Sequence, residues 1–280
     1  MGAQLTVVPL AQQIRRGPVG VLGVPDGLTW VDASDGNLEA AAIRGIAEHF
    51  GLDGAVVQDG TAIAPEAGWP AVLAQAGVSS TNGRGVHVVC VLVLRRQLLD
   101  WTVGRKCRDD VVWVPRDHRW GSADDAQAVA LAVEAARELL RRTSIATIFV
   151  GPVFSLPELR YVYDDLWDTT MDAPNFQRRF TAPSSALLRP MPNVEVANAA
   201  EAHQLEGVVV TRTRTSESRV AMAHPPGPGR PPQLWLAGDE VTLEPPLMVP
   251  RKAGWRRAVL GPWQFEDLQG GLNQTRASPD

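Results

Sequence analysis

The sequence is poor in cysteine and in lysine, and each shortage narrows what the chain can be. It has two cysteines, Cys90 in an apolar run and Cys107 in a basic stretch. Two cysteines at this separation form neither a disulfide framework nor a zinc-ligand spacing. Lys106 and Lys252 are the only lysines, so arginine carries nearly all of the positive charge. The net charge is −4, and a chain of this kind has no overall attraction for nucleic acid. Any contact with DNA must come from a local basic surface.

The sequence also lacks apolar runs long enough to span a bilayer, and we expect no contact with a membrane. Its first residues, Met-Gly-Ala-Gln-Leu-Thr, have neither the basic patch nor the apolar stretch of a secretion signal. These two absences predict a cytoplasmic protein.

The most informative stretch runs from Phe154 to Phe180 and predicts two short helices joined by a tight turn. Ser155 followed three residues later by Glu158 is typical of a capping box at a helix start. Apolar residues then recur at helical spacing and form one stripe. The stripe consists of Leu156, Leu159, Tyr163 and Leu166. Asp172 caps the second helix, in which Phe176 and Phe180 face the first.

The free face of the second helix carries side chains that read or hold DNA in other proteins. Asn and Gln can pair with adenine, and Arg can pair with guanine or phosphate. The helix carries Asn175, Gln177, Arg178 and Arg179, of which Asn175, Arg178 and Arg179 fall on the side away from the apolar stripe. A short apolar helix followed by a helix with such a face is the pattern of a helix-turn-helix. An ordinary helical hairpin has the same spacing, and the pattern by itself does not distinguish the two.

The part of the chain before this stretch alternates short apolar runs with two helical patterns. Runs at 5–10, 19–24, 83–94 and 111–114 indicate strands, and further short strands begin near 56 and 61. Ile43, Ile46, Ala47 and Phe50 have helical spacing and Gly51 is a helix stop. Residues 124–142 form a longer helix, with acidic residues at its start and basic residues at its end.

Residues 28–52 resemble the box of the Nudix family, a loop–helix–loop motif that ends in Glu-Glu-x-Gly-apolar. With the last positions placed on Gly51-Leu52, the motif arginine falls on Arg44 and the first closing glutamate on Glu48. The other box positions depart from the motif. Trp30 stands at the opening glycine, Gly36 and Gly45 stand at glutamates, and His49 stands at the second closing glutamate.

In the Nudix family the glutamates hold Mg²⁺ or Mn²⁺ against a diphosphate. Such cations need several oxygen ligands, which one glutamate and an imidazole do not supply. We therefore expect no conventional Mg-dependent hydrolase, no bound metal or cofactor, and no catalytic residue of the usual kind. Arg44, Glu48 and His49 remain candidates for binding a small molecule, because an arginine here can pair with a phosphate. Arg44 could equally pair with a nearby carboxylate. His87, within an apolar strand, is expected to be a satisfied core histidine, and His118 to face solvent.

The order of these parts resembles the Nudix-related transcriptional regulators of the NrtR type. In that family a Nudix-like sensor domain precedes a winged helix-turn-helix. The run Gly229-Arg-Pro-Pro-Gln-Leu-Trp-Leu236 is similar to the strand that ends the winged domain. The resemblance implies an α+β chain: a Nudix-like α/β/α sandwich with a mixed sheet, followed by a winged-helix domain. The boundaries expected from it are a Nudix-like domain over 1–143, a winged-helix domain over 144–245 with a long wing insertion at 190–228, and an arm and tail over 246–280.

The resemblance also implies a function: a homodimer whose inactive sensor domain binds ADP-ribose or a related nucleotide, and which binds DNA through the second helix and wing. Candidate wing and strand residues for DNA are Arg212, Arg214 and Arg230. Arg212 and Arg214 alternate along one strand and would share a face, which fits either a DNA-facing wing or a solvated strand edge.

The charge of the helical stretch opposes strong DNA binding. Residues 154–190 carry four arginines against five carboxylates, and phosphate neutralisation supplies much of the affinity for a duplex. Two other functions therefore stay open. The scaffold could serve as an enzyme without hydrolytic activity, or as a small-molecule-binding protein of secondary metabolism. It could also bind another protein through its tryptophan-rich C-terminal part.

Overall fold

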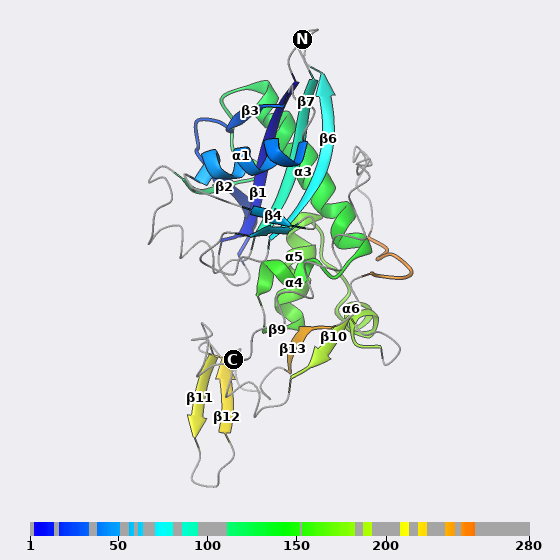
Figure 1. The fold of residues 1–280 in the computed structure, drawn as a ribbon. Coiled ribbons are helices and arrows are strands. Elements are labelled where there is room, and N and C mark those ends of the chain that lie inside the picture. Colours follow the sequence, from blue (N-terminus) through cyan, green and yellow to red (C-terminus); the bar gives the residue numbers. More distant parts are fainter. Residues whose placement is uncertain are drawn as a thin grey trace.

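A computed structural model gives the fold of the chain (Figure 1). It describes residues 3–13, 17–33, 38–50, 56–58, 61–63, 71–80, 86–94, 111–151, 153–182, 187–191, 208–212, 218–222, 233–238 and 242–249.

The N-terminal half is built on one mixed sheet. Its order is β4-β5-β6-β7-β1-β2-β8, and β3 pairs with β1 beside this path. Strands β1 and β7 run parallel, and the other pairs are antiparallel. The strands are β1 (Ala3–Gln12), β2 (Val19–Gly23), β3 (Trp30–Asp32), β4 (Val56–Gln58), β5 (Thr61–Ile63), β6 (Ala71–Ser80), β7 (Val86–Leu94) and β8 (Val112–Pro115).

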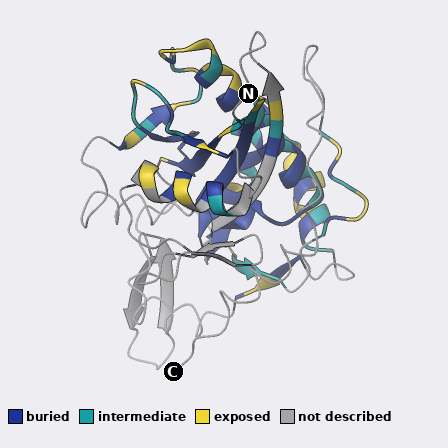
Figure 2. Ribbon diagram, turned by 45° about the horizontal axis from the view of Figure 1, so that its top comes forward, coloured by how far each residue is buried: buried dark blue, intermediate teal, exposed yellow. Residues whose placement is uncertain are grey.

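Among the described residues, one helix covers each face of this sheet, because the central strands are apolar on both sides. Side chains alternate between faces along a strand. Leu5 and Val7 pack on one face, against α1 (Leu38–Phe50), whereas Val8 and Leu10 pack on the other, against α3 (Ala123–Arg142). The two helices lie on opposite sides of the sheet in Figure 1. Most of the described sheet is buried, and part of α1 is exposed (Figure 2). The expected layered sandwich with a mixed sheet is confirmed.

The second half of the chain continues from α3 without a break in the core. Its described residues form three further helices and a three-stranded antiparallel sheet of order β10-β13-β9. These elements are α4 (Ala146–Val150), β9 (Phe154–Ser155), α5 (Leu156–Leu166), α6 (Ala173–Phe180), β10 (Leu188–Pro190) and β13 (Leu234–Ala237). Phe149, Tyr163 and Phe180 belong to the same apolar cluster as Val8 and Leu10. One core therefore joins the sheet to the helices.

A separate hairpin lies between β10 and β13 in the sequence. It consists of β11 (Val208–Arg212) and β12 (Ser218–Met222), which pair only with each other among the described strands. Because β10 and β13 are direct neighbours in the sheet, the hairpin is an insertion in sequence between two paired strands. The hairpin lies at the far end of the molecule from the large sheet (Figure 1).

Several elements were not predicted from sequence patterns, among them β6 and α4. β6 is rich in small residues, and its pairing with β7 shifts register between Gln75 and Gly77. α4 is entirely buried, so it has no amphipathic pattern to read. No helix in the described part of the chain has the length and apolar character needed to cross a bilayer.

Candidate functional site

Helices α5 and α6 form the predicted pair, and their start follows the predicted cap. The Ser155 N–H and Oγ–H both donate to Glu158 Oε2, at 2.8 and 2.9 Å. Both residues are buried, so this capping box is shielded from water. The predicted helix start is confirmed.

An aromatic cluster sets the packing of α6 on α5. The rings of Phe176 and Phe180 have centroids 4.5 Å apart, and both contact the Tyr163 ring, at 5.4 and 5.7 Å. The Tyr163 hydroxyl donates to the Leu140 carbonyl at 3.1 Å, and burial raises its pKa far above the usual range. The cluster ties α6 through α5 to α3.

The turn between the helices is held by carboxylates. Met171 N–H donates to Asp164 Oδ1 at 2.6 Å, and Asn175 N–H donates to Asp172 Oδ1 at 2.9 Å. Asp168 has a φ of 45°, a left-handed conformation that asparagine, aspartate and glycine tolerate best. Three of the five carboxylates that lower the charge of this stretch therefore shape the turn.

The predicted DNA-reading residues of α6 do not share one environment. Asn175, Gln177 and Arg178 are exposed, and Arg178 Nη2 donates to Asn175 Oδ1 at 2.6 Å. Arg179 Nη2 donates instead to the carbonyl of Pro245, in the segment 242–249. In this structure Arg179 therefore binds the chain itself, whereas Asn175, Gln177 and Arg178 present a polar face to solvent.

The segment 242–249 is fixed on the C-terminal end of α3. Leu243 N–H donates to the Arg142 carbonyl at 2.6 Å, and Leu247 N–H donates to the Arg141 carbonyl at 2.7 Å. These bonds satisfy carbonyls that a helix end leaves free. An open cleft of about 760 Å³ lies here, lined by Arg142, Thr242, Leu243, Glu244, Pro245 and Pro246.

The side chains of the remaining arginines predicted to contact DNA lie outside the described residues. Arg212 ends β11, where its backbone pairs with Ser218. The Arg212 side chain, and Arg214 and Arg230 as whole residues, lie outside the described part of the chain.

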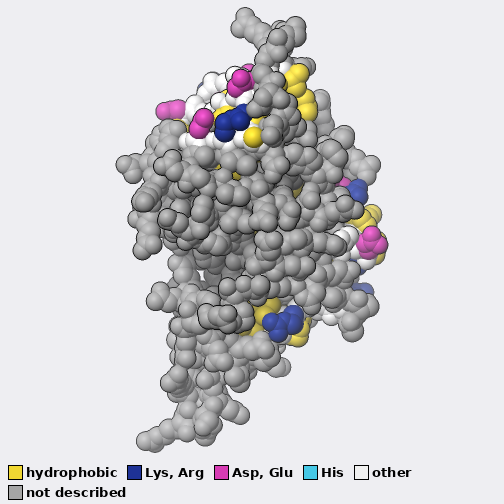
Figure 3. All heavy atoms as spheres, in the orientation of Figure 1, with side chains coloured by type: hydrophobic (Ala, Val, Ile, Leu, Met, Phe, Trp, Pro, Cys, Tyr) yellow, Lys and Arg dark blue, Asp and Glu magenta, His cyan; other side chains and the backbone are white. Residues whose placement is uncertain are grey.

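The degenerate Nudix box lies beside a small open cavity of about 420 Å³. Its lining residues are Trp30, Val31, Asp32, Arg44 and Glu48. Arg44 and Glu48 are exposed and one turn apart on α1, and Arg44 Nη2 donates to the Asp32 carbonyl at 2.7 Å. The His49 side chain lies outside the described residues. Side chains of both signs meet near α1 and β3 in Figure 3.

The packing of α1 on the sheet explains why a single substitution would not restore a magnesium site in the box. A Cβ at Gly45, where the motif has a glutamate, would lie 3.3 Å from Val7 Cγ2 and 3.7 Å from Leu5 Cδ2. Position 45 therefore faces the apolar sheet and has no room for a carboxylate. Among the described residues there is also no group of three or more side chains suited to hold a metal. The donor set does not fit the divalent cation of Nudix hydrolases.

Two histidines differ from the sequence-based expectation. His118 is half-buried: its Nε2 donates to the Pro25 carbonyl at 3.2 Å, and its ring lies edge-on to Trp120. The expectation that it faces solvent was wrong, because the turn at 24–27 folds back over it. The rings of His87 and Trp30 are tilted at 44° with centroids 4.7 Å apart. The buried Nδ1 of His87 has no hydrogen-bond partner among the described residues, so it is not the satisfied core histidine expected.

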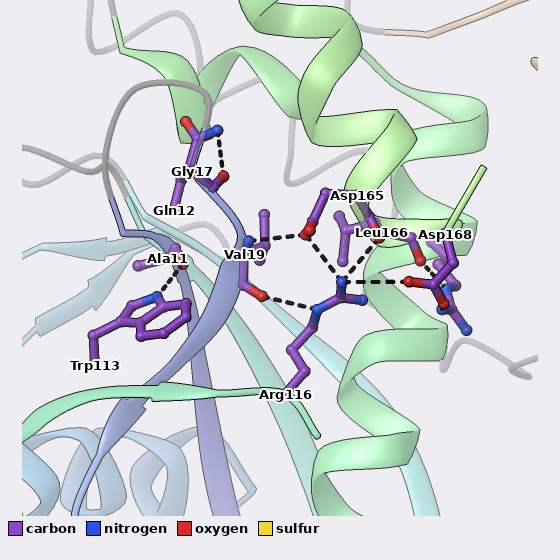
Figure 4. Close-up of polar contacts among 10 residues, drawn as sticks. Ala11, Gln12, Gly17, Val19, Trp113, Arg116, Asp165, Leu166 and Asp168 are labelled. Carbon is purple, nitrogen blue, oxygen red and sulfur yellow. Dashed lines mark hydrogen bonds and ion pairs between the residues drawn. The ribbon is translucent and has the colours of Figure 1, made fainter. Parts of the chain in front are cut away.

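Sequence patterns gave no sign of a polar junction between the sheet and the helix pair (Figure 4). Arg116, just after β8, donates from Nε to the Val19 carbonyl at 2.8 Å and from Nη2 to both the carbonyl and Oδ2 of Asp165, at 2.8 and 3.0 Å. Asp165 Oδ2 also accepts from Val19 N–H at 2.9 Å. Asp165 lies in the last turn of α5. These contacts join residues far apart in sequence, so no local spacing reveals them.

A second arginine holds the same end of α5 from the side of α3. Arg137 Nε donates to the Leu166 carbonyl at 2.6 Å, and Arg137 also pairs with Glu134. The Asp168 carboxylate lies between the two arginines, 4.0 Å from Arg116 and 3.8 Å from Arg137. Burial raises the pKa of Asp165, although the charge of Arg116 acts to lower it. The junction therefore holds its charges at a cost in solvation.

Comparisons with known proteins show the fold. The chain is similar to the crystal structure of NrtR from Shewanella oneidensis, with 18% identity and a TM-score of 0.50 over 84% of this chain and 93% of that chain. It is equally similar to the same NrtR complexed with a 27mer DNA, with 18% identity and a TM-score of 0.50 over 86% of this chain and 97% of that chain. A MutT/nudix family protein from Enterococcus faecalis matches with 11% identity and a TM-score of 0.49, over 84% of this chain and 86% of that chain.

No protein-family model matches the sequence, and no curated protein matches it. The resemblance to NrtR-type regulators is therefore confirmed at the level of the fold, by structures that are matched along nearly their whole length.

Proposed function

We propose that this protein is a Nudix-related transcriptional regulator that binds DNA through α6. The observation that carries the proposal is the exposed face of α6: it presents Asn175, Gln177 and Arg178 while Phe176 and Phe180 are buried beneath it. A DNA complex of a protein with this fold supports the same assignment.

The order of elements in the second half supports a winged helix. It runs α4–β9–α5–α6–β10–β13, with the three strands in one antiparallel sheet and the hairpin β11–β12 inserted between the last two. We infer a winged-helix domain over 144–245, after a Nudix-like domain over 1–143 and before an arm over 246–280. In this arrangement α6 is the recognition helix and the hairpin extends the wing.

The cavity beside α1 is proposed as the sensor site of an inactive Nudix-like domain. Its charged side chains are one arginine and two carboxylates, and its size suits a small polar metabolite. A nucleotide sugar such as ADP-ribose is the ligand that the family resemblance implies, with Arg44 as its phosphate contact. The protein acts as a homodimer in this proposal, because a dimer doubles the contacts to DNA.

Recruitment of the scaffold as a new enzyme is the second candidate, and the geometry favours it less. Such an enzyme would have its reactive pocket covered, with the end of α6 hidden under the long insertion. Asn175 is instead exposed, and both cavities described above are open to solvent.

Binding to a duplex from the region upstream of the protein's own gene tests the proposal. We expect saturable binding by fluorescence anisotropy that weakens steeply as salt rises from about 50 to about 200 mM. Arg178→Ala should weaken binding about tenfold or more, because one good arginine contact to a base is worth about 1–3 kcal/mol. Arg119→Ala is the matched control, since Arg119 is an exposed arginine in the loop before α3.

The proposal fails if the protein binds neither this duplex nor any member of a random-sequence duplex library at low salt. It also fails in its assignment of α6 if Arg178→Ala and Arg119→Ala have the same small effect.

A further inference from the structure

We propose that Arg116 and Asp165 are positioning residues that form a latch, through which the loop between β8 and α3 sets the helix pair α5–α6 on the sheet. The inference rests on the proposed function for its consequence on DNA, but the latch itself is tested without DNA.

The latch joins Val19, the first residue of β2, to the C-terminal end of α5. β2 pairs with β8 only up to Gly20 and Pro115, so the next backbone groups of β2, at Val19, have no strand partner on that side. Asp165 and Arg116 fill this gap: Asp165 Oδ2 accepts from Val19 N–H, and Arg116 Nε donates to the Val19 carbonyl. The end of α5 thus takes the place of a strand partner beside Val19, as Figure 4 shows.

Charge and burial make this contact specific. The side chains of Arg116 and Asp165 are 17% and 15% exposed, so water competes little for the pair. Arg116 also donates to the Asp165 carbonyl, so one guanidinium holds both the backbone and the side chain of the same residue. A fork of this geometry fits arginine and is not reproduced by lysine.

The loop that carries Arg116 is anchored on its other side to the turn that precedes β3, the strand that lines the candidate sensor cavity. Two residues beyond Arg116, His118 donates to the Pro25 carbonyl. That turn leads directly into β3, whose three residues line the cavity. Trp30 of β3 in turn donates from Nε1 to Asp125 Oδ1 at the start of α3, at 2.8 Å. A shift of β3 therefore reaches the loop through His118, and reaches α5 through Arg116.

We do not expect the latch to add much to the free energy of unfolding. Buried ion pairs often contribute little net stability, because desolvation offsets the attraction between the charges. What they fix is geometry, and the geometry here is the placement of α5, Asp168 and the turn into α6.

Hydrogen–deuterium exchange on the full chain tests the latch. Arg116→Ala should raise exchange about tenfold in peptides from residues 160–182, while peptides from residues 128–140 of α3 stay as in the wild type. Arg116→Lys should restore only part of the protection, and Arg119→Ala, in the same loop, none of the effect. Unchanged exchange at 160–182 in Arg116→Ala would overturn the latch, and so would an equal rise throughout the chain.

A double-mutant cycle tests the coupling to the cavity wall. His118→Ala should raise exchange at 160–182 about threefold in the wild-type background and have no further effect when Arg116 is already alanine, because the path between them is then broken. Equal effects of His118→Ala in the two backgrounds would contradict the coupling.

A DNA-binding measurement on the same variant separates the two proposals. In the duplex assay above, Arg116→Ala should weaken binding although Arg116 does not touch the α6 face. If the wild type binds no DNA, the proposed function fails while the exchange results still decide whether the latch exists.

Discussion

Two glycines allow the backbone of this protein to pack more closely than other residues would permit. A Cβ at Gly20 would lie 2.5 Å from the ring of Trp113 and 2.5 Å from the Val114 carbonyl oxygen. The Trp113 ring crosses β2 there to donate from Nε1 to the Ala11 carbonyl at 3.1 Å. Gly45 plays the same role between α1 and β1.

Gly45 gives a direct prediction about the degenerate box. Gly45→Glu should lower the free energy of unfolding by about 2 kcal/mol or more, since it forces a carboxylate against Val7 and Leu5. Gly45→Ala is the matched control and should cost about 1 kcal/mol or less, because Val7 need move only slightly. Urea unfolding of both variants measures the difference.

The same variant tests whether position 45 only packs against the sheet or could hold a carboxylate that binds a metal. If Gly45→Glu folded as stably as the wild type and bound Mg²⁺ in a calorimetric titration, the assignment of α1 as a non-metal helix would be wrong.

At the scale of elements, the capping box is the local feature on which α5 depends. Ser155→Ala should cost about 1–2 kcal/mol, because it removes the bond from Oγ to Glu158 within a buried cap. Thr170→Ala, which removes an exposed hydroxyl, serves as the reference substitution. The measurement is the shift in urea midpoint at unchanged slope, and an equal, negligible shift in the two variants would contradict the role given to Ser155.

The C-terminal end of α3 gives an element-scale prediction for pH. Burial acts to raise the pKa of Glu138, but hydrogen bonds and charges from Arg141 and Arg142 outweigh it and lower the pKa below the usual value. A carboxyl group with a lowered folded-state pKa contributes stability above its ordinary pKa, near 4.3, and loses it as pH falls through the folded-state value.

Glu138→Gln should therefore differ most from the wild type at neutral pH. The gap in free energy of unfolding should shrink as pH falls below about 4.3. A gap that stays constant from pH 7 to pH 3 would show that Glu138 gains nothing from its arginine partners in the folded state.

What sequence patterns could predict follows from how local each signal is. The helices α3, α5 and α6 each carry a cap and an apolar stripe within one short stretch, and all three were predicted. The strands β1, β2, β7 and β8 are apolar runs and were also predicted. β6 and α4 were missed, because small residues or complete burial erase the periodicity.

The candidate site was harder to predict because its contacts join distant parts of the chain. Helical spacing placed Asn175, Arg178 and Arg179 on the free face. The first two are exposed, whereas Arg179 is half-buried. The bond from Arg179 to Pro245 and the junction of Arg116 with Asp165 span 66 and 49 positions. Such pairs become visible only once the topology is known.

At the scale of the whole molecule, one apolar cluster extends from β1 to α6. Phe180 is fully buried in the cluster that also contains Val8, Leu10 and Val89. Modules with separate cores can unfold separately, whereas this arrangement couples them.

Phe180→Ala should therefore lower the stability of both halves together. We expect a loss of about 3–5 kcal/mol and a single unfolding transition by calorimetry, as in the wild type. Gln177→Ala, on the exposed face of the same helix, is the control and should change stability by about 0.5 kcal/mol or less. Two separated transitions in the Phe180 variant would contradict a shared core.

The central claim, that α6 binds DNA, is tested most directly by the salt dependence of binding to the upstream duplex in the wild type and in Arg178→Ala. The account predicts that log Kd rises linearly with log salt concentration, and that the variant binds about tenfold more weakly. If Arg178 holds a phosphate, the slope falls by about 0.9 in the variant; if it reads a base, the slope stays the same. Affinity that does not depend on salt, or that is the same in Arg178→Ala and the wild type, would contradict it.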